Sequence, residues 1–316
     1  MMEKNSDIET DNSGDDYETE SSGLPIEGFP LGIAGSFFLT AGTTLLTFFI
    51  SMILALILVK LLKMPLDGVS FIVVSIAGSS VWGVSAFISA NRLILPADVL
   101  SFKKEISLKL IILIVFLIPF VILCGSQLET IALYFHGDFG SNAGLSMFVK
   151  TSILAPWTVL LTLFAVSVVA PVSEELFFRG VIVRSLMLKK FSPALVIGFS
   201  AVLFAAVHMQ IKGFFLLSTV GGVLAIIRMN SSSLVPSVIF HSLYNFLVIS
   251  ISILPVIFSE PEFNEFSLKY TDAVFEKPDL KMLSQSLLLA ALSLFLVFRI
   301  LGRISSELSR INSEDK

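Results

Sequence analysis

The sequence carries little charge for its length. Only 15% of its 316 residues are Asp, Glu, Lys or Arg, whereas 55% are hydrophobic and the mean hydropathy is +0.90. Soluble globular domains have about 25% charged residues, so this composition excludes an ordinary soluble domain. It indicates a polytopic membrane protein. We expect no nucleic-acid partner.

Cysteine is almost absent. The single cysteine, Cys124, lies in an apolar run and has no partner in the sequence, which excludes a disulfide framework and a thiol-rich metal site. No internal repeat and no glycine-rich phosphate loop is present. No basic segment precedes a short apolar core near Met1, so we expect no cleavable signal peptide.

Acidic residues are concentrated at the N-terminus. Residues 1–30 hold nine Asp and Glu side chains against the single basic residue Lys4. Such a segment cannot bury enough apolar surface to fold alone, and we predict a disordered acidic tail. At the other end, residues 303–316 are predicted to form a polar C-terminal tail.

Long apolar runs fill most of the chain between these ends. A membrane-spanning helix needs about 20 mostly apolar residues. The qualifying windows are Leu31–Leu62, Val69–Ala90, Ile106–Cys124, Phe148–Ala170, Leu234–Phe258 and Ser284–Leu301. With shorter helices between Glu174 and Arg228, we predict an all-α membrane bundle of eight or nine helices over residues 31–302. We expect a multi-pass protein of a bacterial plasma membrane.

The shorter helices are bounded by clear turn signals. Ser192 and Pro193 form a helix start, with the serine as N-cap and the proline in the first helical position. Lys212-Gly213 and the run that begins at Asn230 mark the next two breaks. Membrane orientation stays open at this stage, because Lys60 and Lys63 flank one end of Val69–Ala90 while Arg92, Lys103 and Lys104 flank the other.

Six polar side chains lie inside these apolar segments: Glu174, Glu175, Arg179, His208, His241 and Asn245. Ionisable groups at membrane depth cost at least ~2.5 kcal/mol and mark pathways or reaction sites. Glu175 and Arg179 are four residues apart and are predicted to pair on one helix face. Glu174 is rotated by about 100° and is predicted to point away from that pair.

The spacing predicts that the polar residues converge. Glu174 lies 17 residues before Phe191 and His208 lies 17 after it, so a hairpin that turns there sets both at one depth. Pro171 and Ser173 suggest that a helix begins just before Glu174. His241 and Asn245 share a face of a later helix that returns to the same region.

This grouping suits hydrolysis of a peptide by activated water. Glu174, assisted by His208, would deprotonate water, and His241 with Asn245 would donate hydrogen bonds to the developing oxyanion. Arg179 would hold Glu175, and Phe204 would pack against His208. A zinc ion held by Glu174, His208 and His241 stays an alternative, although the ion would occupy the glutamate that the reaction needs as its base. We therefore favour a site without metal or cofactor.

The ordered motifs resemble those of the CPBP family of intramembrane proteases, which includes the Ras-converting CAAX prenyl endopeptidases and the Abi immunity proteins. Three motifs carry the resemblance: Glu174-Glu175-x-x-x-Arg179, Phe204-x-x-x-His208 and His241-x-x-x-Asn245. The similar segment covers about 171–250. It implies that Glu174 activates water with His208 and that His241 and Asn245 bind the oxyanion.

Three functions are consistent with these residues. The first is an intramembrane endopeptidase that cleaves a membrane-anchored, possibly prenylated, peptide or protein. The second is a non-catalytic membrane partner, such as a scaffold or immunity protein. The third, a transporter with Glu174 and His208 as a proton relay, ranks last because no inverted repeat is present. The sequence leaves the oligomeric state open.

Overall fold

A computed structural model of the chain describes residues 29–64, 68–93, 95–102, 106–136, 156–258 and 278–314. Within these ranges the chain forms eight helices and no strand. They are α1 with its extension η1 (Ile33–Leu61), α2 (Gly68–Arg92), α3 (Leu108–His136), the continuous helix α5–α7 (Pro156–Leu188), α8 (Pro193–Ala206), α9 (Phe214–Asn230), α10 (Val235–Phe258) and α12 (Leu280–Glu314). A short 3-10 turn, η2, covers Ala97–Leu100. The all-α prediction is confirmed.

Five of these helices are long and apolar enough to cross a membrane: α1 with η1, α2, α3, α5–α7 and α12. Only 6% of the most apolar window of α1 is buried inside the bundle. Phe38, Leu45 and Phe49 are among the large side chains that α1 exposes. Water would penalise this surface at about 25 cal/mol per Å² of apolar area, whereas lipid does not. The chain is a multi-pass integral membrane protein.

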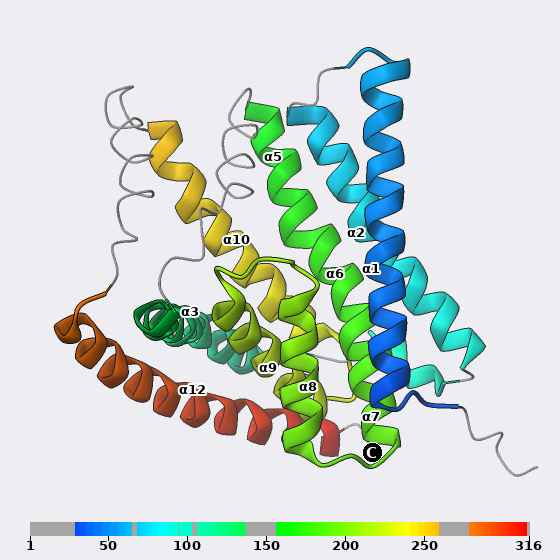
Figure 1. Cartoon of the computed structure of the whole chain (residues 1–316). Helices are drawn as coiled ribbons and strands as arrows, with labels where there is room; N and C mark the ends of the chain where they lie inside the picture. The colour runs from blue at the N-terminus through cyan, green and yellow to red at the C-terminus, as the bar shows by residue number, and fades with distance from the viewer. Residues whose placement is uncertain are drawn as a thin grey trace, which may run out of the picture.

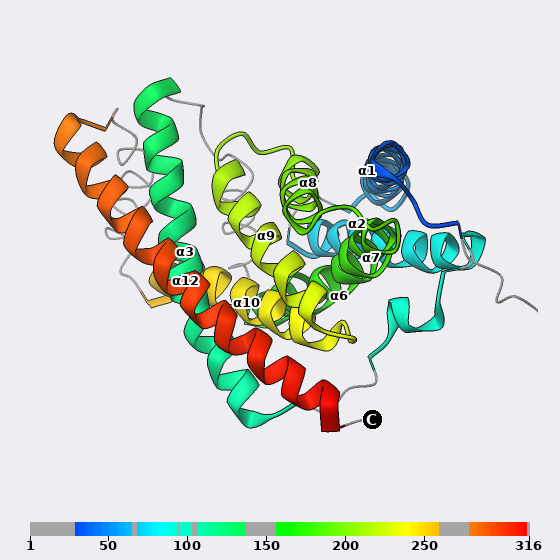
Figure 2. The same ribbon diagram turned by 90° about the horizontal axis from the view of Figure 1, so that it is seen from below.

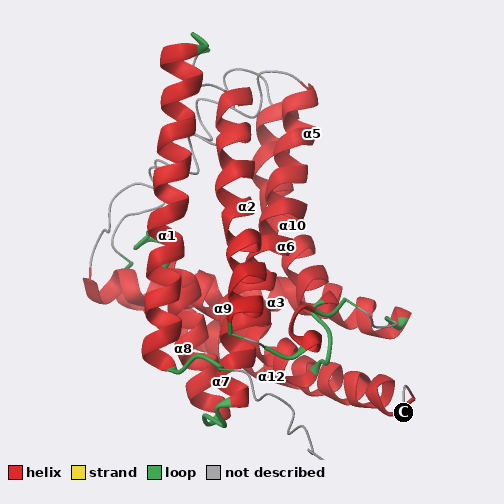
Figure 3. Cartoon of the chain, turned by 90° about the vertical axis from the view of Figure 1, so that its right-hand side faces the viewer, coloured by secondary structure: helices red, strands yellow, loops and turns green. Residues whose placement is uncertain are grey.

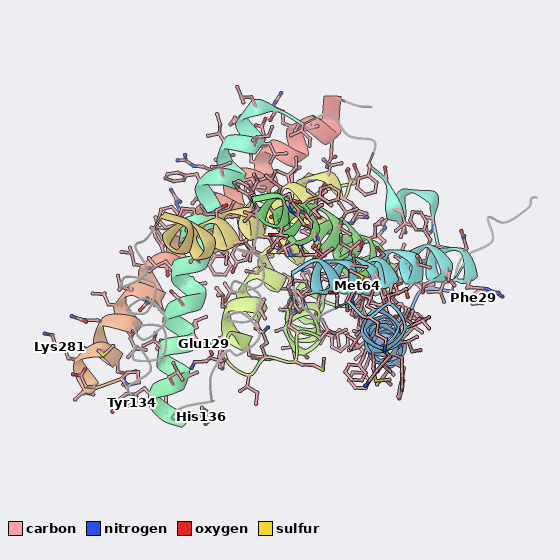
Figure 4. All side chains as sticks on the ribbon, turned by 90° about the horizontal axis from the view of Figure 1, so that it is seen from above. Phe29, Met64, Glu129, Tyr134, His136 and Lys281 are labelled. Carbon is pink, nitrogen blue, oxygen red and sulfur yellow. The ribbon has the colours of Figure 1, made fainter. Side chains whose placement is uncertain are left out.

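The helices run in two main directions. In Figure 1, α1, α2 and the α5–α7 helix run roughly parallel or antiparallel to one another. Figure 2 shows α3 and α12 lengthwise, packed along each other and crosswise to α1. Seen from above, Tyr134, His136 and Lys281 gather at one outer edge, where α3 ends and α12 begins (Figure 4). The α3–α12 pair therefore forms one flank of the bundle.

The helix that carries the glutamates is longer than the sequence suggests. The structure shows one continuous helix in which α5 (Pro156–Phe164) and α6 (Ala170–Glu175) are joined by a π-helical segment, η3 (Ala165–Val169). A second π segment, η4 (Leu176–Val183), precedes α7 (Arg184–Leu188). The prediction that a helix begins just before Glu174 is thus wrong: Pro171 lies inside the helix. The dipole of a helix N-terminus does not act on Glu174.

The hairpin between α7 and α8 matches its prediction. The hydroxyl of Ser192 caps α8 by accepting a hydrogen bond from Leu195 N at 3.4 Å. The break before α9 falls at Gly213, whose φ of +96° is the left-handed conformation that favours glycine. Glu129 of α3 accepts from Gly213 N at 2.9 Å and caps this helix start from outside.

The tightest core surrounds η4. Phe177 and Phe178 are fully buried, and Trp82 of α2 packs against both with ring centroids 4.8 and 5.4 Å away. This aromatic wall fixes the α5–α7 helix immediately after the two glutamates. The predicted acidic tail and the loop 259–277 lie outside the described residues, apart from Phe29 and Pro30. Residues 303–314 continue α12 as helix.

Candidate active site

Glu175 and Arg179 form the predicted ion pair. Arg179 Nη1 lies 3.0 Å from Glu175 Oε1, and both side chains are completely buried. Their four-residue separation in a helical segment puts both on one face. A buried pair of this kind contributes little net stability, but losing one partner strands the other charge in an apolar core. The pair therefore locks the helix in one arrangement.

Helix α9 holds Arg179 from two sides. The guanidinium donates through Nη2 to the carbonyl of Gly221 at 3.1 Å. The backbone carbonyl of Arg179 accepts from Nε of Arg228 at 3.3 Å, and Arg228 also donates to Ser231 O at 2.6 Å. Arg228 is only 2% exposed. The backbone and the side chain of Arg179 are thus both fixed by one neighbouring helix.

Phe204 is the hub between the charged pair and the histidines. Its ring lies 4.6 Å from Arg179 Cζ, close enough for a cation–π contact. The imidazoles of His208 and His241 lie 5.0 and 5.6 Å from the same ring, both edge-on. The predicted packing of Phe204 against His208 is present. One phenyl ring therefore sets the positions of both histidines.

His241 stands between the two glutamates. Its Nδ1 lies 2.9 Å from Glu175 Oε1, and its Nε2 lies 3.9 Å from Glu174 Oε2. Glu174 points away from the Glu175–Arg179 pair, as predicted, but toward the far nitrogen of His241. Glu174 Oε2 is enclosed and accepts no hydrogen bond from the described residues. Its nearest ionisable partner is thus His241, whereas the sequence suggested His208.

Hydrogen bonding fixes the tautomers of both histidines. A backbone carbonyl only accepts, so the 2.8 Å contact of His208 Nδ1 with Phe204 O requires a proton on Nδ1. An ionised Glu175 also only accepts, which puts a proton on Nδ1 of His241. Each neutral imidazole then presents the lone pair of Nε2. His241 becomes a donor at Nε2 only after it takes a second proton.

His208 lies in the turn immediately after α8, not within the helix. It is half-buried, and its neighbours Ala205, Ala206 and Met209 line a cavity of about 310 Å³. Most of the cavity lining is apolar, including Phe214 and Phe215 at the start of α9. The lining residues are chain neighbours of His208, and His208 itself is not among them.

Asn245 makes a bond that the sequence did not predict. In η3 the N–H of Ala170 donates to the carbonyl five residues earlier, that of Ala165. The next donor in this π pattern would be Pro171, which has no N–H. The carbonyl of Val166 therefore lacks a helical partner, and Asn245 Nδ2 donates to it at 2.9 Å. Asn245 thereby fastens α10 to the irregular segment next to Glu174.

Two parts of the site were not identified from the sequence. Arg228 ends a helix among apolar residues and matches none of the three motifs. The Gly221 carbonyl is a backbone group, which no side-chain pattern indicates. Both act through tertiary contacts with Arg179. The buried arginine itself was the available signal, since such a charge in an apolar segment requires a partner.

The zinc alternative stays a prediction. Among the residues that the structure describes, no three His, Cys, Asp or Glu side chains gather as closely as a metal site requires. Nδ1 of each histidine contacts an oxygen, that of Phe204 or of Glu175. Metal-ligating histidines also donate their second ring N–H in this way, so these two contacts are common to the metal-free site and the zinc site.

Comparison with known proteins identifies the segment that carries this site. Residues 156–247 match the family model described as type II CAAX prenyl endopeptidase, Rce1-like. The match spans α5–α7, α8, α9 and the first half of α10, and so includes every residue of the candidate site. No curated protein and no solved structure gives a significant match.

Proposed function

We propose that this chain, a member of the CPBP family by its Rce1-like segment 156–247, is an intramembrane endopeptidase that hydrolyses a peptide bond of a membrane-anchored substrate. Family membership supports a CAAX-type intramembrane protease in general. The observation that carries the finer proposal is the position of Glu174. One carboxylate oxygen, Oε2, is enclosed, accepts no hydrogen bond from a described residue and faces His241 Nε2 at 3.9 Å, while the side chain as a whole is 17% exposed.

In the proposed reaction Glu174 is the general base. It takes a proton from a water molecule, and the water oxygen forms a bond to the scissile carbonyl carbon. The resulting carboxylic acid returns the proton to the amide nitrogen as the C–N bond breaks. His208 Nε2 accepts a hydrogen bond from the same water. Positioned general bases of this kind contribute about 10²–10⁴ in rate.

The proposed oxyanion donors are His241 and Asn245. Glu175 accepts from His241 Nδ1, which stabilises a doubly protonated imidazole whose Nε2–H can donate. One amide hydrogen of Asn245 is used on Val166 O, and the second is available to the oxyanion. Arg179, Phe204 and Arg228 position these groups. The reaction as written needs no metal ion.

The proposed substrate is apolar near its scissile bond. The cavity lined by Ala205, Ala206 and Met209, chain neighbours of His208, is mostly apolar, and the outer faces of the surrounding helices suit lipid. A lipid-anchored peptide, including a prenylated one, reaches such a site from within the membrane. A soluble peptide would first have to leave water, and the desolvation of its polar groups would cost free energy.

The test compares membrane proteomes from cells that carry the wild-type chain or Glu174→Gln, by quantitative mass spectrometry of peptide termini. We expect new C-termini in a set of membrane proteins with the wild type, and their uncleaved forms with Glu174→Gln. Asp279→Asn is the matched control, because it makes the same carboxylate-to-amide change at the exposed N-cap of α12, which lines neither the site nor the cavity.

A non-catalytic scaffold would behave differently. The wild type, Glu174→Gln and Asp279→Asn would then give the same termini, provided that all three accumulate equally in the membrane. Equal termini at equal protein levels would rule out the endopeptidase.

A further inference from the structure

Four hydrogen bonds gather helix ends at one end of the bundle. The N–H of Phe29, before α1, donates to Leu93 O after α2 at 2.7 Å. Leu234 N, before α10, donates to Ser101 O at 2.9 Å. The end of α12 is tied to neighbours by two more bonds, Ser305 Oγ to Asn230 Oδ1 at 2.6 Å and Ser107 Oγ to Glu307 Oε1 at 2.8 Å. These contacts define a common end.

The turn between α7 and α8 lies at this same end. Figures 1 and 3 show it beside the start of α1 and opposite the end of α1 with its extension η1. The α1–α2 hairpin confirms the polarity, because a Cβ added at Gly78 would lie 2.8 Å from Ser51 Oγ, as in an antiparallel pair. The connection from Leu61 to Gly68 is thus at the opposite end.

Basic side chains are concentrated at the common end. Six exposed residues form what we name the basic end: Arg92, Lys109, Lys189, Lys190, Arg303 and Arg310. At the opposite end of the α1–α2 hairpin the exposed basic residues described are Lys60 and Lys63. Glu307 lies at the basic end but is buried, and contacts Lys109 Nζ and Arg310 Nη2 at 2.8 and 2.6 Å. Among the residues whose side chains the structure describes, the exposed charges at this end are therefore cationic.

We infer that the basic end is the surface on which this protein contacts the anionic headgroups of the cytoplasmic leaflet. Lys and Arg near helix ends set the orientation of membrane proteins and face the cytoplasm, whereas Asp and Glu contribute little. Anionic lipids in that leaflet attract such clusters within a Debye length. The sequence left open whether the Lys60 end or the Arg92 end of the second apolar segment faces the cytoplasm. We infer that it is the Arg92 end.

The inference has two structural consequences. The chain enters the bundle at Phe29 from the cytoplasmic side. The connection between α1 and α2 faces the opposite side. Both follow from helix polarity and charge alone, so they hold whether or not the protein is a protease.

Two lysines make a matched pair for testing it. Lys63 and Lys190 each follow a helix end, each is exposed, and each has a φ of +57°. Replacing either with cysteine therefore makes the same chemical change at the same backbone φ. The single native cysteine, Cys124, is buried, so the unmodified chain is the blank.

The experiment labels Lys63→Cys and Lys190→Cys with a membrane-impermeant maleimide, in intact spheroplasts and in inverted membrane vesicles. Labelling after solubilisation gives the total for each variant. We expect Lys190→Cys to react in inverted vesicles and to stay at background in spheroplasts, with the reverse for Lys63→Cys. The opposite pattern, or both cysteines reacting from one side, overturns the inference. Lys60→Cys and Arg303→Cys form a second pair in case one variant does not accumulate.

Discussion

At the residue scale, the decisive feature is a histidine between two carboxylates of different roles. Glu175 is paired with Arg179 at 3.0 Å and contacts Nδ1 of His241, whereas Glu174 faces Nε2 of the same histidine. The two adjacent glutamates thus have different roles. Glu175 orients His241, and Glu174 is the proposed proton acceptor.

Breaking the buried pair should destabilise the protein strongly. Arg179→Met leaves Glu175 charged in a fully buried position, which typically costs about 3–5 kcal/mol. We expect a large fall in the thermal unfolding temperature of the detergent-solubilised protein. Combining Arg179→Met with Glu175→Gln should recover part of the loss, because no charge is then stranded. Equal destabilisation in the single and double variants would contradict this account.

Arg228 should act on turnover through Arg179. Arg228→Gln removes the guanidinium that holds the Arg179 carbonyl, and small displacements of catalytic groups cost up to about 10²-fold in rate. We expect a lower kcat with little change in KM, measured on a cleaved substrate peptide. Arg228→Lys, which keeps the charge and one donor, should retain more of the turnover. A variant that changes only KM would show that Arg228 contacts substrate instead.

At the element scale, the two π segments explain how a proline and two glutamates fit into one long helix. A π turn shifts carbonyls out of the regular ladder, and such turns frequently occur at functional sites. Here Asn245 donates to the Val166 carbonyl, for which Pro171 has no N–H. Arg228 donates to the carbonyl of Arg179. The irregular helix is held in register by side chains from α9 and α10.

A double-mutant cycle tests this explanation of Asn245. Asn245→Ala should cost about 1–3 kcal/mol of stability by leaving the Val166 carbonyl unpaired. Pro171→Ala restores an N–H that can serve the same carbonyl. In that background Asn245→Ala should therefore cost less, a coupling seen by comparing unfolding temperatures of the four proteins. Strict additivity would mean that the proline and the amide act independently.

The close approach of α8 and α9 requires a glycine at position 221 but not at position 222. A Cβ at Gly221 would meet the backbone of Ala201 at 3.1 Å and Phe204 at 3.2 Å, whereas a Cβ at Gly222 would make ordinary contacts from 3.7 Å. Overpacking of this kind costs about 1–3 kcal/mol. Gly221→Ala should lower both stability and activity, because it displaces Phe204. Gly222→Ala, the matched control, should leave both near wild type.

At the scale of the whole molecule, local rules predicted the local features. The i,i+4 spacing predicted the Glu175–Arg179 pair, Ser192-Pro193 predicted the start of α8, and Lys212-Gly213 predicted the break before α9. Each of these depends on residues near one another in the chain. The equal depth of Glu174 and His208 about the hairpin stays a prediction, because the observed contact of Glu174 is with His241 and that of His208 is with Phe204.

The features that the sequence did not predict come from contacts between distant segments. Pro171 suggested that a helix starts there. The helix instead continues through the proline in a π register, and that register depends on Asn245, 74 residues later in the chain. The approach of His241 to both glutamates depends on how α10 crosses the α5–α7 helix. Arg228 contacts Arg179 because α9 packs against η4. Periodicity along the chain carries no information about such crossings.

The most direct test of the central claim is cleavage of a prenylated, fluorescence-quenched C-terminal peptide by purified protein reconstituted in liposomes. The wild type should release the C-terminal fragment, also in the presence of a metal chelator. Glu174→Gln should lose about 10²–10⁴ of the rate while keeping the wild-type unfolding temperature. Wild-type turnover by a correctly folded Glu174→Gln protein would contradict the account.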